Sequence, residues 1–248
     1  MDETIESDGF RLGAHFVRPP GAMRVPGLVL CHGFPNGARG AATAGATFPE
    51  LADQIARDVG WASLAFNFRG AGVSEGDFSI SGWMADLRNA LRWLEARPDI
   101  GALAICGAGT GGALAICEAA RNASVRAVAV MSAPASLSDW ARDPGRLLQH
   151  ARSIGLITTK GFPEDYQAWI RPLTQLDPVV SARLLAPRPL LVLHGSDDDV
   201  VPESEARALA AAAGSSGELH LIHGGTHEIR HDPRAIAGLL GWLDRQSF

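Results

Sequence analysis

Short apolar runs alternate along most of the chain with segments whose apolar residues recur at helical spacing. Runs of this length are typical of strands buried on both faces of a parallel sheet. The expected strands are residues 27–31, 61–66, 102–106, 125–131, 190–193 and 219–222. The expected helices are residues 48–59, 83–96, 113–121, 203–213 and a closing helix that begins at Asp232 and Pro233. This order predicts an α/β fold with a doubly wound, mostly parallel sheet.

Two segments depart from that rhythm. Residues 3–18 alternate apolar and polar side chains around the turn pair Asp8-Gly9, which predicts a β-hairpin and an antiparallel N-terminal edge of the sheet. Residues from about 133 to 187 contain several prolines and one run of helical spacing, at 146–157. A segment of that length between two strands predicts a small helical lid inserted into a single domain that spans residues 1–248.

Composition and charge narrow the class of protein. Of the 248 residues, 46% are hydrophobic and 20% are charged, as in a protein with a large core, and the net charge of −5 gives no reason to expect nucleic acid or anionic membrane as a partner. The acidic start of the chain argues against a signal peptide. Three cysteines in apolar segments indicate buried thiols in a reducing compartment, so we expect a cytoplasmic protein.

The glycine-rich turn at residues 107–112 matches two motifs with different chemistry. Gly107, Gly109 and Gly112 fit Gly-x-Gly-x-x-Gly, the phosphate cradle of dinucleotide-binding folds. That motif also needs an acidic residue at the end of the next strand, and residues 131–133 there are Met-Ser-Ala. Gly107 and Gly111 instead fit the nucleophile elbow Gly-x-Ser-x-Gly, with Gly109 in the place of the serine. The missing acid favours the elbow.

The elbow makes further demands that the chain meets. Its nucleophile should be followed in the sequence by an acid and then by a histidine. Asp198 follows one strand and His227 follows the next, so both are expected at the carboxyl edge of the sheet, beside the glycine turn. The backbone N–H groups of Thr110 and Phe34 are the expected oxyanion hole.

Taken together, these stretches resemble the α/β-hydrolase fold, close to the small esterase, dienelactone-hydrolase-like and peptidase-like members. The matching stretches, in the order of the family, are residues 32–35, 67–76, 107–112, 194–202 and 224–227. The resemblance implies a hydrolase of small carboxylic esters or related acyl compounds, with Asp198 and His227 as acid and base. In the family the place of Gly109 holds serine or cysteine, and glycine has no side chain to form an acyl-enzyme.

Three explanations of Gly109 stay open at this stage. It is an engineered, inactivating replacement of a serine; or the natural chain uses the Asp198–His227 dyad as a general base without hydrolysis; or the protein binds a ligand without turnover. The expected partner is a small molecule, and we expect no cofactor. The aromatic residues predicted to line its pocket from the lid are Trp140, Tyr166 and Trp169.

Other candidate residues are expected to have structural roles. Residues 227–231 match the zinc signature His-Glu-x-x-His, but Pro233 close behind favours a turn over the helix that zinc binding needs, so no metal is expected. His32 and His194 are expected to hold loops at strand ends. Arg69 is expected to tie neighbouring loops, and Glu118 to lie on a solvated helix face.

Overall fold

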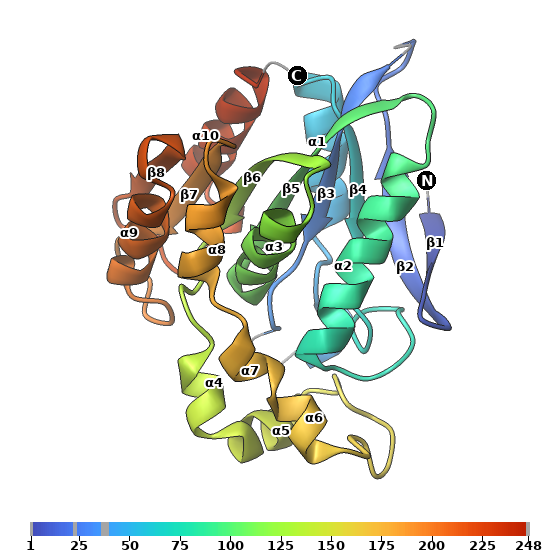
Figure 1. Cartoon of the computed structure of the whole chain (residues 1–248). Helices are drawn as coiled ribbons and strands as arrows, with labels where there is room; N and C mark the ends of the chain where they lie inside the picture. The colour runs from blue at the N-terminus through green and yellow to red at the C-terminus, as the bar shows by residue number, and fades with distance from the viewer. Residues whose placement is uncertain (1, 22–23, 36–39, 247–248) are drawn as a thin grey trace.

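The sheet in the computed structural model has eight strands in the order β1-β2-β4-β3-β5-β6-β7-β8 (Figure 1). The structure describes residues 2–21, 24–35 and 40–246. The strands are β1 (Asp2–Ser7), β2 (Phe10–Val17), β3 (Val25–Cys31), β4 (Ala62–Phe66), β5 (Ile100–Ala108), β6 (Val125–Met131), β7 (Leu190–Gly195) and β8 (Gly217–Ile222). β1 pairs antiparallel with β2, and β2 antiparallel with β4. All other pairs are parallel, so the predicted fold class and N-terminal edge are confirmed.

Helices cover both faces of this sheet. The apolar sides of α1 (Phe48–Asp58) and α10 (Pro233–Asp244) pack on one face, and those of α2 (Ile80–Glu95), α3 (Gly109–Arg121) and α9 (Glu203–Ala212) on the other. The central strands β3, β5 and β6 are buried almost throughout, which is why their sequences read as continuous apolar runs. In the described part of the chain, no helix combines the length and the apolar character needed to cross a bilayer.

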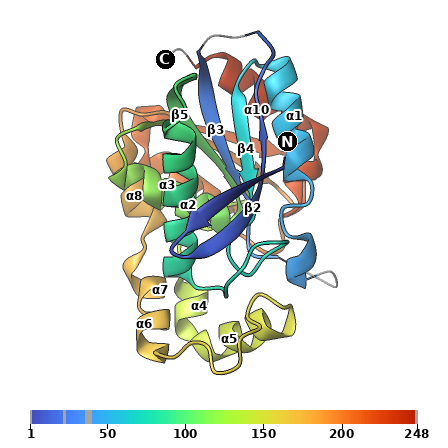
Figure 2. The same cartoon turned by 90° about the vertical axis from the view of Figure 1, so that its right-hand side faces the viewer.

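Five helices lie between β6 and β7. They are α4 (Ser138–Arg142), α5 (Pro144–Ser153), α6 (Tyr166–Ile170), α7 (Pro172–Gln175) and α8 (Pro178–Leu185). Figures 1 and 2 show α4 to α7 gathered at one end of the sheet, while α8 returns along the face that carries α3. Helices α4 to α7 thus form one end of the molecule, at the edge of the sheet where β6 ends.

In two of the helices that begin earlier than predicted, a capping side chain sets the first turn. α2 begins at Ile80, not at 83, since the Ser79 side chain accepts a hydrogen bond from the Gly82 N–H. The helix predicted at 146–157 is α5, which begins earlier because Asp143 caps it, and which ends at Ser153. In both cases the capping side chain, Ser or Asp, is visible in the sequence.

Two ion pairs, one buried and one half-exposed, fix α2 to the rest of the fold. Arg69 donates through Nη2 and Nε to the Asp86 carboxylate on α2, at 2.7 and 3.0 Å, and Asp86 also accepts from the Ser7 hydroxyl at the hairpin. The expected loop-tying role of Arg69 is thereby confirmed. The expectation for Glu118 is wrong: its side chain is 3% exposed and pairs with Arg88 of α2, because α2 covers that side of α3.

Candidate active site

The turn from β5 into α3 is built from four glycines, of which three cannot carry a side chain. A Cβ on Gly107 would meet the Gly111 carbonyl oxygen at 2.6 Å, and one on Gly112 would meet the Ala133 Cβ at 2.8 Å. A Cβ on Gly111 would collide with the backbone oxygen of His32. These glycines are therefore required by close backbone packing at the end of the strand.

Gly109 is the exception, because a side chain would fit there. A Cβ at this position would lie 3.6 Å from the Gly33 Cα and 3.9 Å from His227 Nε2, both ordinary van der Waals distances. Its φ of +50° is left-handed, as expected where a strand turns sharply into a helix. The backbone thus presents the position of residue 109 directly to the imidazole of His227.

His227 is held by Asp198 across the two neighbouring loops that follow β7 and β8. Its Nδ1–H donates to the carboxylate, 3.0 Å from Oδ2 and 3.1 Å from Oδ1. This hydrogen bond fixes the tautomer that leaves Nε2 as the acceptor, on the side of Gly109. The His227 side chain is 18% exposed, so it meets the solvent of the pocket, whereas that of Asp198 is fully buried.

The environment keeps Asp198 ionised. Burial alone would raise the pKa of its carboxyl group, but hydrogen bonds from the Val201 N–H at 2.8 Å, from His227 and from the Val200 N–H outweigh it and lower the pKa below the ordinary 3.8. The neighbouring Asp197 and Asp199 are exposed. The geometry therefore singles out Asp198 among three consecutive aspartates.

Two buried histidines support the loops around this dyad. The His32 Nδ1–H donates to the Gly33 carbonyl at 2.7 Å, and its Nε2 accepts from the Phe68 N–H at 3.1 Å. Burial lowers the pKa of His32 to about 4, so the ring stays neutral. His194 Nε2–H donates to the Val201 carbonyl at 2.9 Å, in the loop that carries Asp198. Both rings have the structural role expected of them.

A pocket of about 300 Å³ opens above Gly109 and His227. Phe34 and Thr110, the residues predicted to form the oxyanion hole, both line it, as does Trp140. The Phe34 ring contacts Trp140 edge-on and stacks on His150 of α5, with centroids 5.0 and 5.7 Å apart. His150 was not predicted, because nothing in its local sequence distinguishes it. The pocket thus combines an aromatic wall with the dyad.

Two of the predicted pocket residues lie elsewhere. Trp169 is buried away from the pocket because its indole N–H donates to the Phe78 carbonyl at 3.0 Å. Tyr166 stacks on Trp169, and neither lines the pocket of the dyad. Of the three aromatic residues expected to reach down from the helical segment, only Trp140 does so.

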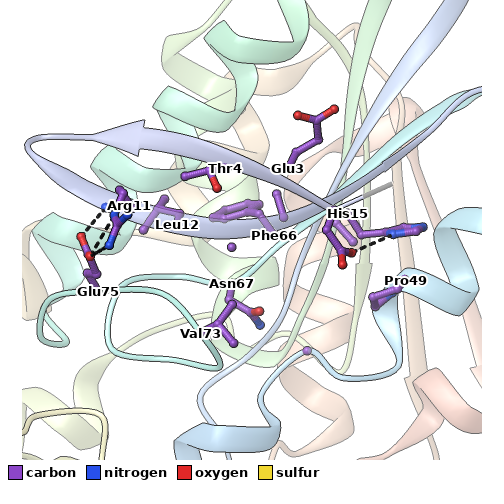
Figure 3. Close-up of a pocket in the computed structure, with 15 residues that line it drawn as sticks. Glu3, Thr4, Arg11, Leu12, His15, Pro49, Phe66, Asn67, Val73 and Glu75 are labelled. Atoms are coloured by element: carbon purple, nitrogen blue, oxygen red, sulfur yellow. Dashed lines mark hydrogen bonds and ion pairs between the residues drawn. The ribbon is translucent and has the colours of Figure 1, made fainter.

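A larger cavity, of about 500 Å³, lies apart from the dyad between the N-terminal hairpin and the loop after β4 (Figure 3). Arg11 and Glu75 close one end of it with a two-point ion pair, and His15 lies toward the other. None of the predicted site residues lines it. Although it is the larger of the two, its charged groups are held in ion pairs, Arg11 with Glu75 and His15 with Asp53, so it is the weaker candidate for catalysis.

The thiols of Cys106 and Cys117 and the expected absence of a metal site can be compared with the structure. Burial raises the pKa of Cys106 to about 12 and that of Cys117 to about 11, which keeps both thiols protonated. Residues 229–231 form a short 3₁₀ turn, so His227 and His231 do not share a helix face. Among the residues that the structure describes, no three His, Cys, Asp or Glu side chains are grouped to hold a metal ion.

Comparison with known proteins identifies the family. The model described as alpha/beta hydrolase fold matches residues 26–154, and the model of serine aminopeptidase, S33, matches residues 173–234. The chain belongs to the alpha/beta hydrolase fold family. Its relatives include an uncharacterised protein of Mycobacterium tuberculosis, 28% identical over 96% of this chain and 74% of that protein. Another, the uncharacterised protein YfhR of Escherichia coli, is 28% identical over 65% of this chain and 51% of its own.

Solved structures share the fold. Est1E from Butyrivibrio proteoclasticus, solved with ferulic acid bound, superposes with a TM-score of 0.75 at 20% identity and covers 98% of this chain and 96% of its own. The α/β hydrolase GrgF from Penicillium has a TM-score of 0.75 at 18% identity and covers 99% of this chain and 98% of its own. Both likenesses cover nearly the whole of this chain.

Proposed function

We propose that this protein hydrolyses small carboxylic esters or related acyl compounds, and that the Asp198–His227 dyad activates a water molecule in place of a serine. One observation carries the proposal. His227 Nε2 lies 3.9 Å from the point where a Cβ of residue 109 would stand, on the wall of a pocket lined by Phe34 and Thr110. A water molecule bound between this point and the imidazole, clear of the Gly109 Cα, can donate a hydrogen bond to Nε2 and face an ester carbonyl.

The reaction follows from the roles of these groups. His227 Nε2 takes a proton from the water as its oxygen attacks the acyl carbon, and the Asp198 carboxylate stabilises the imidazolium that forms. The backbone N–H groups of Phe34 and Thr110 stabilise the oxyanion. His227 then gives the proton to the leaving alkoxide. Because Gly109 carries no nucleophile, hydrolysis takes place in one displacement at the acyl carbon, and no acyl-enzyme is formed.

The expected rate is modest. Enzymes of this type that lack the nucleophile retain about 10³–10⁴-fold catalysis over water, from the oxyanion hole and substrate binding. Water activation by an intact dyad adds to that background. The protein is therefore expected to be a slow esterase whose activity depends on His227.

The test compares four variants on a short-chain p-nitrophenyl ester, each confirmed as folded by circular dichroism. His227→Ala removes the base, and Asp198→Asn disturbs the tautomer. Gly109→Ala places a methyl group 3.9 Å from Nε2, where it crowds the water. Each is expected to lower kcat at least about 10-fold. His223→Ala, an exposed histidine on the same loop, is the matched control and should leave kcat unchanged.

Two results would contradict this function. If the folded native chain hydrolyses no ester faster than buffer does, the protein is not an esterase. The result would then favour a dyad that transfers protons without hydrolysis, or a pocket that only binds a ligand. Equal rates of hydrolysis in the native chain and in His227→Ala would show that the dyad does not contribute to the activity.

A further inference from the structure

We propose that the larger cavity, between the N-terminal hairpin and the loop after β4, is a second binding site, which takes a small primary alkylammonium ion. The carboxylates of Asp2 and Asp53 hold the charged end of the ion beside His15, and its apolar chain lies along β2. The cavity is separate from the catalytic dyad, because neither residue of the dyad lines it. This binding therefore does not depend on the proposed function.

The cavity exists because small residues form its floor. Side chains alternate along β2, so Arg11, Gly13 and His15 share one face of the sheet. Ala65 of the neighbouring strand β4 pairs with His15. A Cβ on Gly13 would collide with the side chain of Val73, which reaches over from the loop after β4. Glycine and alanine at the centre of this face thus leave room for a cavity of about 500 Å³.

The end of the cavity at His15 carries more carboxylates than cations. His15 Nε2 lies 2.8 Å from Asp53 of α1, and its Nδ1 lies 3.8 Å from Asp2 of β1, so one imidazole faces two carboxylates. The carboxylate of Glu3, which also lines the cavity, is paired with Arg97. Each carboxylate can accept several hydrogen bonds, and an ammonium group has three N–H donors and one positive charge. A cation therefore complements this end of the cavity.

The opposite end is closed by an ion pair that is already balanced. Arg11 donates to Glu75 through Nη2 at 2.6 Å and through Nε at 3.0 Å, and Figure 3 shows this pair across the cavity from His15. The guanidinium of Arg11 repels a second cation, which directs the ammonium group to His15. Arg11 and His15 are four residues apart on an extended strand, a span of about 13 Å. The cavity is thus long enough for an alkyl chain.

The surface between the two ends is largely apolar. Pro49, Ala65, Phe66 and Val73 line it, and the Val73 side chain is 84% exposed. A short alkyl chain on this surface removes apolar area from water, so each added methylene group should tighten binding about 2- to 4-fold. An alkylammonium ion thus matches both the charged end and the apolar middle of the cavity.

Gly45 lies between this cavity and the pocket of the dyad, since it lines both. The pocket of the dyad also has carboxylates in its lining, those of Asp139, Glu205 and Glu228. An alkylammonium ion in that pocket would be attracted by other carboxylates than those of Asp2 and Asp53. Variants in each cavity therefore distinguish the two places of binding.

The experiment titrates n-hexylammonium and n-butylammonium chloride into the ¹⁵N-labelled native chain near neutral pH, where both amines are protonated. Amide chemical shifts report the site and the Kd. The expected Kd of n-hexylammonium is about 1 mM, with n-butylammonium about 10-fold weaker. Hexanoate and n-hexanol have the same chain without the cation and should bind at least about 10-fold more weakly than n-hexylammonium.

Variants locate the binding. Asp2→Asn combined with Asp53→Asn should weaken n-hexylammonium binding at least about 10-fold, because both carboxylates are lost. Asp58→Asn, on the same helix as Asp53 but outside the cavity, is the matched control and should leave the Kd unchanged. Asp139→Asn, in the pocket of the dyad, should also leave it unchanged. Native amide spectra without ligand confirm that each variant is folded.

Three outcomes would overturn the inference. They are the absence of saturable shifts up to about 50 mM n-hexylammonium, equal binding of hexanoate or n-hexanol, and weakening by Asp139→Asn but not by the double variant. The first two need no variant. None of these measurements involves an ester, so the inference can fail while hydrolysis is observed, and it can hold where hydrolysis is absent.

Discussion

Lowering the pH should destabilise the fold through a single buried ring, that of His32. This side chain is 2% exposed, and burial lowers its pKa from an ordinary 6.5 to about 4. Between these two values the unfolded chain binds a proton at His32 and the folded chain does not. The free energy of unfolding therefore falls as the pH drops from 6.5 to 4, and this contribution is fully present only above 6.5.

The magnitude follows from the pKa difference. At about 1.4 kcal/mol for each pKa unit, protonation of His32 costs the folded state about 3 kcal/mol by pH 4. That is a large share of the 5–15 kcal/mol typical of a domain. The lowered pKa of Asp198 acts in another window: its stabilising effect is present above pH 3.8 and is lost only as the pH falls further. Between pH 6.5 and about 4.5, the effect of His32 on the free energy of unfolding is thus separated from that of Asp198.

The assay is urea unfolding followed by tryptophan fluorescence at several pH values between 7.5 and 4.5, on the native chain and on His32→Gln. Glutamine cannot ionise, and its side-chain oxygen can still accept the hydrogen bond from the Phe68 N–H. The variant should lose less stability than the native chain across this range, by about 2–3 kcal/mol. His223→Gln, at an exposed histidine, is the control and should follow the native chain. Parallel curves for the native chain and His32→Gln would refute the reasoning.

Three further predictions concern the site and the core. Gly109→Ser should raise ester hydrolysis at least about 100-fold, as p-nitrophenol release will measure, and should cost about 1–2 kcal/mol of stability because its φ is +50°. Asp86→Ala should lower the free energy of unfolding by about 3–5 kcal/mol in thermal melts, because it leaves the buried guanidinium of Arg69 without its main partner. The control Asp58→Ala, at an exposed ion pair, should lower it by less than about 1 kcal/mol. Trp140→Ala should raise KM more than it lowers kcat, because Trp140 lines the pocket from α4, and a selective loss of kcat would contradict that position.

The sequence predicts well those parts of the fold whose burial is evident from a local run of apolar side chains. The short apolar runs at 125–131 and 190–193 favour buried strands, and both are strands. Asp198 and His227 could be expected to meet because each follows a strand of the same parallel sheet, and strand ends share an edge. Their 3.0 Å hydrogen bond is a consequence of topology as much as of local sequence.

The parts that escape prediction depend on neighbours distant in the chain. α6 and α7 have five and four residues, too few for an apolar period to appear. A glutamate such as Glu118 is typical of an exposed helix face, and its burial here depends on Arg88 of the neighbouring helix α2, with which it forms an ion pair. Trp169 and Trp140 both lie in short helices between β6 and β7. The indole of Trp169 donates to the carbonyl of Phe78, whereas Trp140 lines the pocket. The aromatic wall on Phe34 is likewise assembled from separate segments.

The four glycines of the elbow also bear on how such a chain can change over generations. Three of them are closed to any side chain, so variation there breaks the turn. Gly109 is open, and glycine codons GGU and GGC become the serine codons AGU and AGC by replacement of a single nucleotide. Where the codon of Gly109 is GGU or GGC, a serine at this position is therefore one point mutation away, with the Asp198–His227 pair and the backbone of the turn already in place. Under the mechanism proposed above, a change at this one codon would exchange water-based for covalent catalysis while the core is inherited unchanged.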